Sequence, residues 1–445
     1  MKTLKWTVLG LVFSTIIYGL PISRDTLPCG LIVLTYETHQ LPFIELRWVS
    51  YAGSAYDPKG KEGLANFTNK MLTRGTKTRN AYQLNQELEF LGASLSEGVS
   101  KELGFFHLRF LSKDTDTILE ILADILQNPA FSEIELQKLK TKTILEIKED
   151  LDYPYELGAR KFFSLLLKDH PYGHEPSGDT ETVARFTLHD VKEFYQRHYT
   201  LNNSFLVAAG DFKREEFLRK LNEHFKDLPR GNKLEEIPEI PPGPYAESPQ
   251  GYIIHKPELN QSYVFLGFYG ISERNEDLVA VRAMNFILGG SPLVSRIGNR
   301  VRESAGLAYD VRSGFYRWRY GGVFIATTQT SDPVRAVRYI TEEIEKLSKT
   351  GVTLQELNRT KTFYLGNFPF NFDSMRDKVT FLQDLELYGR SLDYPEKFQE
   401  NIRALTGEKI NTAAKKYLYP TNYLLVIVTN LSKDSLNIPG INWLN

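Results

Sequence analysis

The chain has 445 residues, too many for one ordinary hydrophobic core, and this length predicts two or three compact units. Hydrophobic residues make up 42% and charged residues 24%, which is typical of a folded globular protein and excludes a disordered or fibrous one. Because 54 basic residues are balanced by 55 acidic ones, no global field draws the protein to nucleic acid or anionic lipid, and neither is an expected partner.

The N-terminus has the pattern of a secretory signal. Lys2 and Lys5 precede an uncharged apolar run from Trp6 to Tyr18, and we assign residues 1–20 to a signal peptide. The run is shorter than the roughly 20 apolar residues of a spanning helix, which favours cleavage, although the cleavage site fits the small-residue rule only partly. We expect export across the inner membrane to the periplasm. An uncleaved anchor is the alternative, and only then would the protein contact the membrane.

The first half then reads as strands and amphipathic helices. Residues 27–34 predict a strand that contains Cys29, the single cysteine, which excludes an internal disulfide framework and the common cysteine-based zinc sites. Residues 44–49 predict another strand. Leu64, Phe67 and Met71 recur at helical spacing before Gly75, a stop signal. Strands at 93–99 and 105–111 and a helix around 118–125 follow.

A proline-rich segment at 227–250 holds six prolines and few periodic apolar positions, so we interpret it as a linker between domains at 21–226 and 251–445. The two domains resemble each other weakly but in constant phase. Phe131-Ser132 with Glu135-Leu136 matches Val352-Thr353 with Glu356-Leu357, and Tyr199 with Asn202 matches Tyr419 with Asn422. This repetition indicates one α+β unit built twice.

Several short motifs follow one another along the chain. They are Leu27-Pro28-Cys29-Gly30-Leu31, Ala52-Gly53-Ser54 with Asp57, Lys61-Glu62-Gly63-Leu64-Ala65, Arg74-Gly75-Thr76, Glu89-Phe90-Leu91-Gly92-Ala93, His170-Pro171-Tyr172-Gly173 and Gly306-Leu307-Ala308-Tyr309. In this order they resemble the pitrilysin or insulinase family of inverted-motif zinc peptidases, in its short bacterial two-domain form. The resemblance implies two homologous domains, each an antiparallel sheet covered by helices, as in the mitochondrial processing peptidase.

Active members of this family carry His-x-x-Glu-His on a helix, where two histidines one turn apart bind zinc and the glutamate is the general base. Here the five residues run from Asn66 to Lys70, with Asn69 in place of the base. Glu146 matches the distant glutamate ligand, which leaves one ligand where catalytic zinc needs three. We therefore expect no metal in this chain. Lys70 could pair with Glu146 in the vacated site or point into solvent, and the sequence does not decide between them.

The second domain keeps another feature of the family. Val294, Ile297 and Val301 form the apolar stripe of a helix, Gly306 can end it, and the chain then enters a strand through Tyr309. By resemblance, Arg302 and Tyr309 are the arginine–tyrosine pair that reaches the active centre from the opposing half, where it contacts the substrate main chain and the oxyanion. An arginine on a helix beside a tyrosine is otherwise an ordinary surface or packing residue.

The resemblance predicts a non-catalytic, substrate-binding subunit of a heterodimeric zinc metallopeptidase. A homologous chain with intact His-x-x-Glu-His would supply the zinc, this chain would supply Arg302 and Tyr309, and the substrates would be unfolded peptides. The alternative is an inactive homologue with a structural or peptide-binding role.

Other residues that could suggest a site have structural explanations. His170 and His174 are separated by Pro171 and Gly173, which disrupt a helix, so a structural loop is expected instead of a metal pair. His198 is expected to pack on the helix before a strand. Three aromatic residues alternate at strand spacing and are expected to pack on one sheet face, with a cavity-lining role as the alternative: Tyr316, Trp318 and Tyr320.

Overall fold

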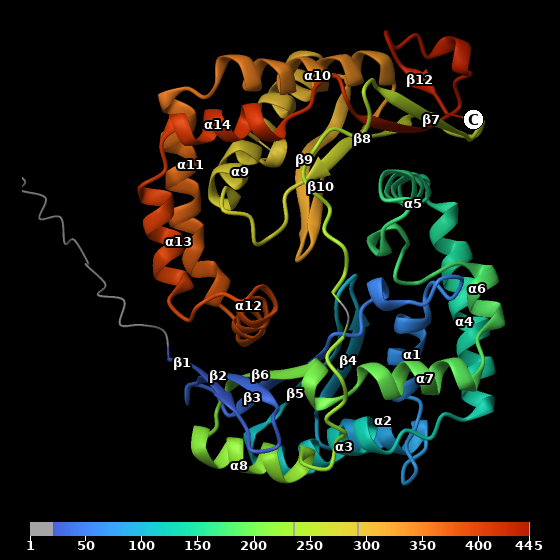
Figure 1. The fold of residues 1–445 in the computed structure, drawn as a ribbon, viewed down its shortest axis with the longest axis vertical. Coiled ribbons are helices and arrows are strands. Elements are labelled where there is room, and N and C mark those ends of the chain that lie inside the picture. The colour runs from blue at the N-terminus through green and yellow to red at the C-terminus, as the bar shows by residue number, and fades with distance from the viewer. Residues whose placement is uncertain (1–20, 235, 292, 445) are drawn as a thin grey trace, which may run out of the picture.

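The computed structural model describes residues 21–234, 236–291 and 293–444. The predicted signal peptide at residues 1–20 lies outside these ranges. The chain forms two halves, each with a six-stranded sheet and a set of helices, which lie one above the other in Figure 1. This confirms the predicted α+β unit built twice.

The elements of the first half follow in chain order. They are β1 Ile22–Thr26, β2 Ile32–Glu37, β3 Phe43–Ser50, η1 Ser54–Tyr56, α1 Leu64–Leu72, α2 Ala81–Phe90, β4 Ser94–Val99, β5 Gly104–Leu111, η2 Ser112–Asp114, α3 Thr115–Gln127, α4 Glu133–Asp152, α5 Pro154–Leu166, η3 Pro171–Gly173, α6 Thr180–Arg185, α7 Leu188–His198, η4 Leu201–Asn203, β6 Ser204–Gly210 and α8 Arg214–Phe225.

The elements of the second half repeat much of this order. They are β7 Gln250–His255, β8 Ser262–Gly270, α9 Leu278–Asn285, the π-turns η5 Phe286–Gly290 and η6 Gly298–Ser304, β9 Ala308–Trp318, β10 Gly321–Thr330, α10 Pro333–Thr350, α11 Leu354–Asn367, η7 Phe368–Phe372, α12 Met375–Tyr388, α13 Tyr394–Arg403, α14 Gly407–Tyr417, β11 Leu424–Thr429, η8 Lys433–Ser435 and β12 Asn442–Trp443.

The two sheets have the same strand order, which explains the repeat in the sequence. The first is β1-β2-β6-β3-β5-β4 and the second is β12-β7-β11-β8-β10-β9. The expectation of a purely antiparallel sheet in each half is wrong. Strand β6 pairs with β2 in parallel, and β11 pairs with β7 in parallel. In both halves, a long stretch of chain that includes several helices separates the two parallel strands, β2 from β6 and β7 from β11. A connection of that length permits parallel pairing.

The prediction of one strand at residues 27–34 is wrong for residues 27–31 and confirmed for residues 32–34, which begin β2. The chain instead turns between β1 and β2, which pair antiparallel from Ile22↔Tyr36 to Thr26↔Ile32. Gly30 has φ +100°, in the left-handed region that glycine adopts without strain, and the Gly30 N–H donates to the Leu27 carbonyl at 2.8 Å. The apolar character of this turn reflects its burial, since Leu27 and Leu31 both belong to the first core.

Helix α5 of the first half packs on the sheet of the second half. Its Phe162 and Leu166 are buried in one cluster with Phe265 of β8 and Val426 of β11. A Cβ at Gly158 would lie 2.2 Å from the Phe265 ring, so the helix approaches the sheet closely at this glycine. Figure 1 shows α5 beneath the second sheet, next to β7 and β8.

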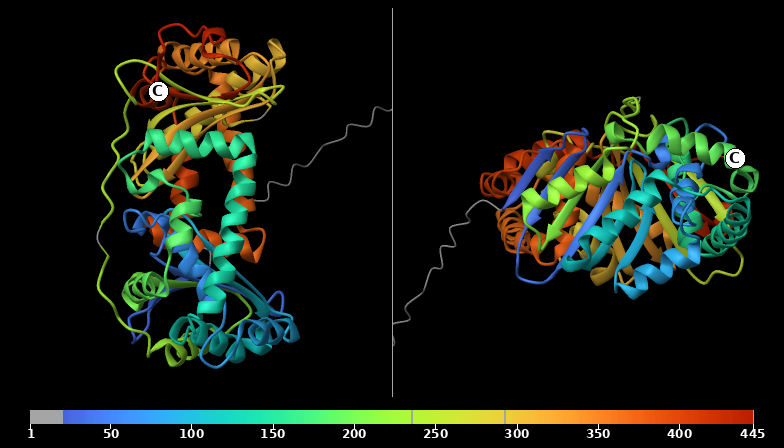
Figure 2. Two further views of the ribbon diagram at one scale, coloured as in Figure 1. Left: turned by 90° about the vertical axis from the view of Figure 1, so that its right-hand side faces the viewer. Right: turned by 90° about the horizontal axis from the view of Figure 1, so that it is seen from below.

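Helix α12 of the second half makes the reciprocal contact with the sheet of the first half. Val379 and Leu382 are buried against Val207 of β6 and Val49 of β3. Polar contacts surround this packing: Arg47 donates to Gln383 at 2.8 Å, and the Arg24 guanidinium contacts the Glu386 carboxylate at 2.7 Å. Each half therefore completes one face of its sheet with a helix of the other half. The left view of Figure 2 shows α5, in teal, directly beneath the second sheet.

The hairpin tips of the two sheets meet where the halves join. Glu102, between β4 and β5, is buried, and its carboxylate accepts hydrogen bonds from the Tyr172 hydroxyl at 2.7 Å and from the Arg319 main-chain N–H at 3.1 Å. Burial raises the pKa of Glu102. Arg319 lies between β9 and β10, and its guanidinium stacks over the Tyr51 ring at 4.8 Å.

The predicted linker runs between α8 and β7, although its last residue, Gln250, already belongs to β7. Ile237 packs into the cluster around α5, and Pro238 accepts a hydrogen bond from His170 at 2.7 Å. No helix within the described ranges is both long and apolar enough to cross a bilayer.

The close approach of α5 predicts opposite effects for two matched glycine substitutions. Gly158→Ala should lower the free energy of unfolding by about 1–2 kcal/mol, because the new methyl group overpacks the interface by more than the gain in helix propensity. Gly366→Ala, in exposed helix α11 with no atom within 4 Å of the new Cβ, should raise it by about 0.5–1 kcal/mol. Chemical denaturation of both variants measures the difference, and equal stabilisation would contradict the packing described for α5.

A buried carboxyl on α12 predicts a pH dependence. Burial raises the pKa of Asp384 to about 6, against the opposing effect of Arg390 and other arginines nearby. Since the folded state holds this proton more tightly than the unfolded chain, the Asp384 contribution to stability falls as pH rises from about 4 to 6. Asp384→Asn should therefore be more stable than the parent by about 2 kcal/mol at pH 7.5, with little difference near pH 4. Thermal unfolding at both pH values tests this, and a gap independent of pH would contradict it.

Candidate functional site

Helix α1 carries residues 66–70, which were predicted to match the zinc motif of the family, and it is anchored at its start by a buried carboxylate. Asp57 accepts hydrogen bonds from the N–H groups of Gly63 at 2.8 Å and Ala65 at 2.6 Å, and it contacts His174 Nε2 at 3.0 Å. Gly63 has φ +97° where the chain enters the helix. Two of the quoted motifs, around Asp57 and around His170, thus serve to orient α1.

Asn69, in place of the general base, is a buried structural residue. Its side-chain oxygen accepts a hydrogen bond from the Tyr199 hydroxyl at 2.8 Å, and its amide donates to the carbonyls of Gly98 at 3.3 Å and Phe105 at 3.4 Å. The side chain is 0% exposed. Asn69 therefore ties α1 to the strands β4 and β5 and to the residue after α7, and its donors and acceptor are used within the fold.

The hypothesis of an ion pair between Lys70 and Glu146 is confirmed. Lys70 Nζ lies 3.3 Å from Glu146 Oε2, and Lys142 on the same helix as Glu146 lies 3.6 Å from the other carboxylate oxygen. The side chains of Lys70 and Glu146 are 28% and 41% exposed, so solvent screens the pair and its contribution to stability is small. The pair joins α1 to α4.

The residues around α1 do not fit a zinc ion. The Asn66 side chain is half-buried and makes no hydrogen bond within the described part of the chain, the Asn69 side chain is bonded within the fold, and Lys70 presents an ammonium group to Glu146. Glu146 is left as the single ligand of the kind zinc prefers. Across residues 21–444, apart from the two undescribed positions, no three His, Cys, Asp or Glu side chains gather closely enough to hold a metal.

Arg302 lies in the π-turn η6, close before β9. Ile297 and Val301 are fully buried, which confirms these two positions of the apolar stripe, but Val294 is half-buried and lies in a turn before the helix begins. Gly306 has φ +61° after the end of η6. The helix is wound more loosely than expected. The Arg302 side chain is 25% exposed and contacts its neighbour Glu303, with both Nε and Nη2 at 2.8 Å from Glu303 Oε1.

Tyr309 is the second residue of the edge strand β9 and is almost fully exposed, at 95%. Val311, two residues further along the strand, is buried in the second core. No ring contact or hydrogen bond of the Tyr309 side chain occurs within the described residues. Both members of the expected pair thus lie near the start of β9, and among the described residues Glu303 is the one side chain that forms an ion pair with Arg302.

The three alternating aromatic residues pack between the halves, which confirms their structural interpretation. The Trp318 ring lies 4.8 Å from the Tyr172 ring, and the Tyr316 ring lies edge-on to Phe163 of α5 at 5.5 Å. Tyr320 is buried in the apolar cluster around α5. These contacts add apolar area to the junction around Glu102.

The histidines also have structural roles, as expected. His170 bonds to the linker and accepts from the Tyr172 N–H at 3.1 Å, and His174 supports Asp57. His198 stacks on Phe194 at 4.1 Å, and burial lowers its pKa to about 4, so it stays neutral at physiological pH. Tyr199 was not foreseen as a site residue. Its contact with Asn69 spans 130 positions of sequence, and local patterns carry no signal for it.

Two family models match most of the chain. The model described as Insulinase (Peptidase family M16) matches residues 33–173, and the model described as Peptidase M16 inactive domain matches residues 185–364.

Relatives match over nearly their whole length. An uncharacterized zinc protease of Rickettsia bellii is 29% identical over 414 residues, which cover 91% of this chain and 97% of the relative. A protein of Helicobacter pylori described as non-peptidase homolog YmxG is 27% identical over 411 residues, 90% of this chain and 92% of the relative.

Solved structures share the fold. The peptidase M16 inactive domain from Pseudomonas fluorescens superposes with a TM-score of 0.85 at 27% identity, over 92% of this chain and 98% of that one. A protease from Helicobacter pylori superposes with a TM-score of 0.83 at 21% identity, over 92% and 99% of the two chains. With the fold, the order of motifs and both family models in agreement, the chain belongs to the insulinase family of peptidases, M16, as a homologue without the inverted zinc motif.

Proposed function

We propose that this chain is the non-catalytic, substrate-binding subunit of a heterodimeric zinc metallopeptidase. The observation that carries the proposal is the exposure of Tyr309, an aromatic side chain that contributes nothing to its own fold, close in sequence to Arg302. A phenol and a guanidinium can donate hydrogen bonds to a peptide main chain and to an oxyanion. In the proposed complex they do so at the site of a homologous partner, which supplies the zinc, and unfolded peptides are the substrates.

The contacts of Asn69 and Lys70 on α1 support the part of the proposal that assigns the zinc to the partner chain. The amide of Asn69 and the ammonium of Lys70 take part in contacts within this chain, so hydrolysis by this chain alone would lack both metal ligands and a general base. The proposal places the assembly in the periplasm, reached through the signal sequence predicted at residues 1–20.

A second candidate is an inactive homologue with a structural or peptide-binding role and no part in hydrolysis. It is favoured by the buried hydrogen bond between Asn69 and Tyr199, because the residue predicted to match the general base contributes here to the interior of the fold. The relative described as a non-peptidase homolog is in line with either candidate. The two differ in what Arg302 and Tyr309 do once a partner is bound.

The geometry of α1 and α4 predicts that zinc ligands can be restored. Since the side chains at positions 70 and 146 already meet, the double substitution Asn66→His/Lys70→His should bind one Zn²⁺ with Glu146 as the third ligand. Calorimetric titration of the apo protein measures the affinity. The parent chain should give no saturable binding in the same range, and adding Glu146→Gln should weaken the variant at least about tenfold. Binding unaffected by Glu146→Gln would contradict the proposed ligand set.

The main proposal predicts that substitutions at Arg302 and Tyr309 lower peptide hydrolysis without preventing assembly of the two chains. A homologous chain with intact His-x-x-Glu-His, the partner that the proposal requires, is co-expressed with this chain, and hydrolysis of an unstructured fluorogenic peptide is measured. Arg302→Ala and Tyr309→Phe should each lower kcat by about 100-fold, as expected for the loss of one oxyanion donor, with the complex intact on gel filtration.

Tyr316→Phe, which removes a hydroxyl elsewhere on β9, is the matched control and should leave kcat unchanged. Unchanged turnover in the Arg302 and Tyr309 variants would favour the second candidate. A partner chain that is fully active without this one would contradict the main proposal.

A further inference from the structure

Two arginines at the junction of the halves carry charges that no ion pair neutralises. Arg319 lies in the turn between β9 and β10, and Arg274 follows the buried Glu273 after β8. Neither guanidinium forms an ion pair or a hydrogen bond with any residue that the structure describes. Since arginines close to a protein interior are normally paired, two unpaired ones at one junction need an explanation.

The guanidinium of Arg319 is held in place by an aromatic ring from each half. Its central carbon lies 4.8 Å from the centre of the Tyr51 ring and 5.1 Å from that of the Tyr320 ring. Its Nε is buried and has no hydrogen-bond partner among the described residues. Stacking on rings fixes the guanidinium plane and leaves its N–H groups to donate within that plane.

Arg274 reaches the same place from the loop after β8. Its side chain is exposed, and its Nη2 lies 3.9 Å from the position that a Cβ at Gly389 would take, at the end of α12. Burial raises the pKa of Tyr51, and the charges of Arg319 and Arg274 both oppose that rise. Such an effect falls off with distance, so both guanidinium groups lie around Tyr51.

The carboxylates of this region are bound to other groups. Glu102 accepts from the Tyr172 hydroxyl and from a main-chain N–H, and Glu386 pairs with Arg24 at 2.7 Å. Glu273 is shared by three other guanidinium groups, those of Arg282, Arg317 and Arg390. These three carboxylates therefore leave the two arginines uncompensated, and the junction attracts an anion.

We propose that Arg319 and Arg274 form a binding site for a carboxylate group at the junction of the two halves. Guanidinium groups bond carboxylates in planar, charge-assisted pairs, which suits the fixed plane of Arg319. The Tyr51 hydroxyl, which has no hydrogen bond within the described ranges, is a further donor. The carboxylate comes from the C-terminus of a peptide or from a free small acid. This site does not involve Arg302 or Tyr309 and does not rest on the proposed peptidase role.

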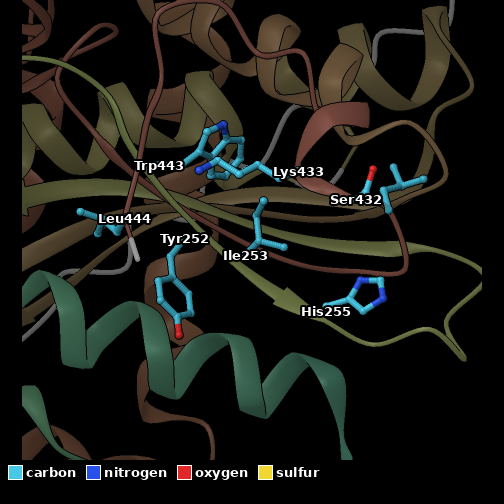
Figure 3. A pocket seen from close by; sticks show the side chains of 8 residues that line it. Tyr252, Ile253, His255, Ser432, Lys433, Trp443 and Leu444 are labelled. Atoms are coloured by element: carbon cyan, nitrogen blue, oxygen red, sulfur yellow. The ribbon is translucent and has the colours of Figure 1, made fainter.

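Two cations elsewhere are matched controls. Arg335 on α10 also stacks on a tyrosine, 5.8 Å from the centre of the Tyr339 ring, but Asp332 lies 3.7 Å from its guanidinium. Lys433 lines a cavity of about 430 Å³ beside β7, together with apolar side chains such as Trp443 (Figure 3). Neither place combines two unpaired guanidinium groups, so neither should bind a carboxylate strongly.

The probes are N-acetyl-tetra-alanine with a free C-terminus, the same peptide as its C-terminal amide, and succinate. Each is titrated with the chain at pH 7 and followed by saturation-transfer NMR. A probe with a carboxylate should bind, and the amide should not. Arg319→Gln and Arg274→Gln should each weaken binding at least about tenfold, whereas Arg335→Gln and Lys433→Gln should not change it.

The ratio of the two affinities identifies the source of the carboxylate. Tighter binding of the free-acid peptide assigns the site to a peptide end, and tighter binding of succinate assigns it to a small acid. The proposal is overturned if neither carboxylate binds, if the amide binds as tightly as the free acid, or if Arg319→Gln has no more effect than Arg335→Gln. Tighter binding of inorganic phosphate than of either carboxylate would also overturn it. If Arg319→Gln fails to fold by circular dichroism, the exposed Arg274 variant and the comparison of acid with amide still decide.

Discussion

The exchange of α5 and α12 between the two sheets is the contact on which the rest of the molecule depends. Each helix buries large apolar side chains, such as Phe162 and Leu382, against the sheet of the opposite half. Exposing one such side chain costs about 1.5–3 kcal/mol, so neither half retains a complete core when separated from the other. The two halves are therefore one cooperative unit, and the buried carboxyl of Glu102 lies at the junction of their hairpins.

The contacts that hold helix α1 in this scaffold do not involve a metal. Helix α1 is held by Asp57 at its start and by burial of Phe67, and neither contact requires a metal. Asn69 and Lys70, which were predicted to match the base and a ligand of the family's motif, form cross-links to Tyr199 and Glu146. The first cross-link is buried and the second is half-exposed, so Asn69 matters more for stability than Lys70.

Local patterns in the sequence predicted much of the architecture but not its long-range pairing. Helical spacing located α1 and α3, and the constant phase between Ser132 and Thr353 marked equivalent helix starts, since these residues precede α4 and α11. The exchange of helices was not predictable, because an apolar stripe does not specify which sheet it covers. The turn around Gly30 was mistaken for strand for a similar reason: buried apolar residues in a turn look like those of a strand.

Burial separates the residues that the fold requires from those it leaves available. Asn69 is inaccessible and fully bonded, so its identity is explained by the interior of this chain. Tyr309 has the opposite environment, since its ring is exposed on an edge strand where a small polar residue would pair equally well. An exposed aromatic ring gives folding almost nothing, yet it gives association a large, rigid surface and a hydroxyl donor. The stability of this chain is therefore insensitive to Tyr309, and any effect of this residue has to arise when a partner or a peptide covers it.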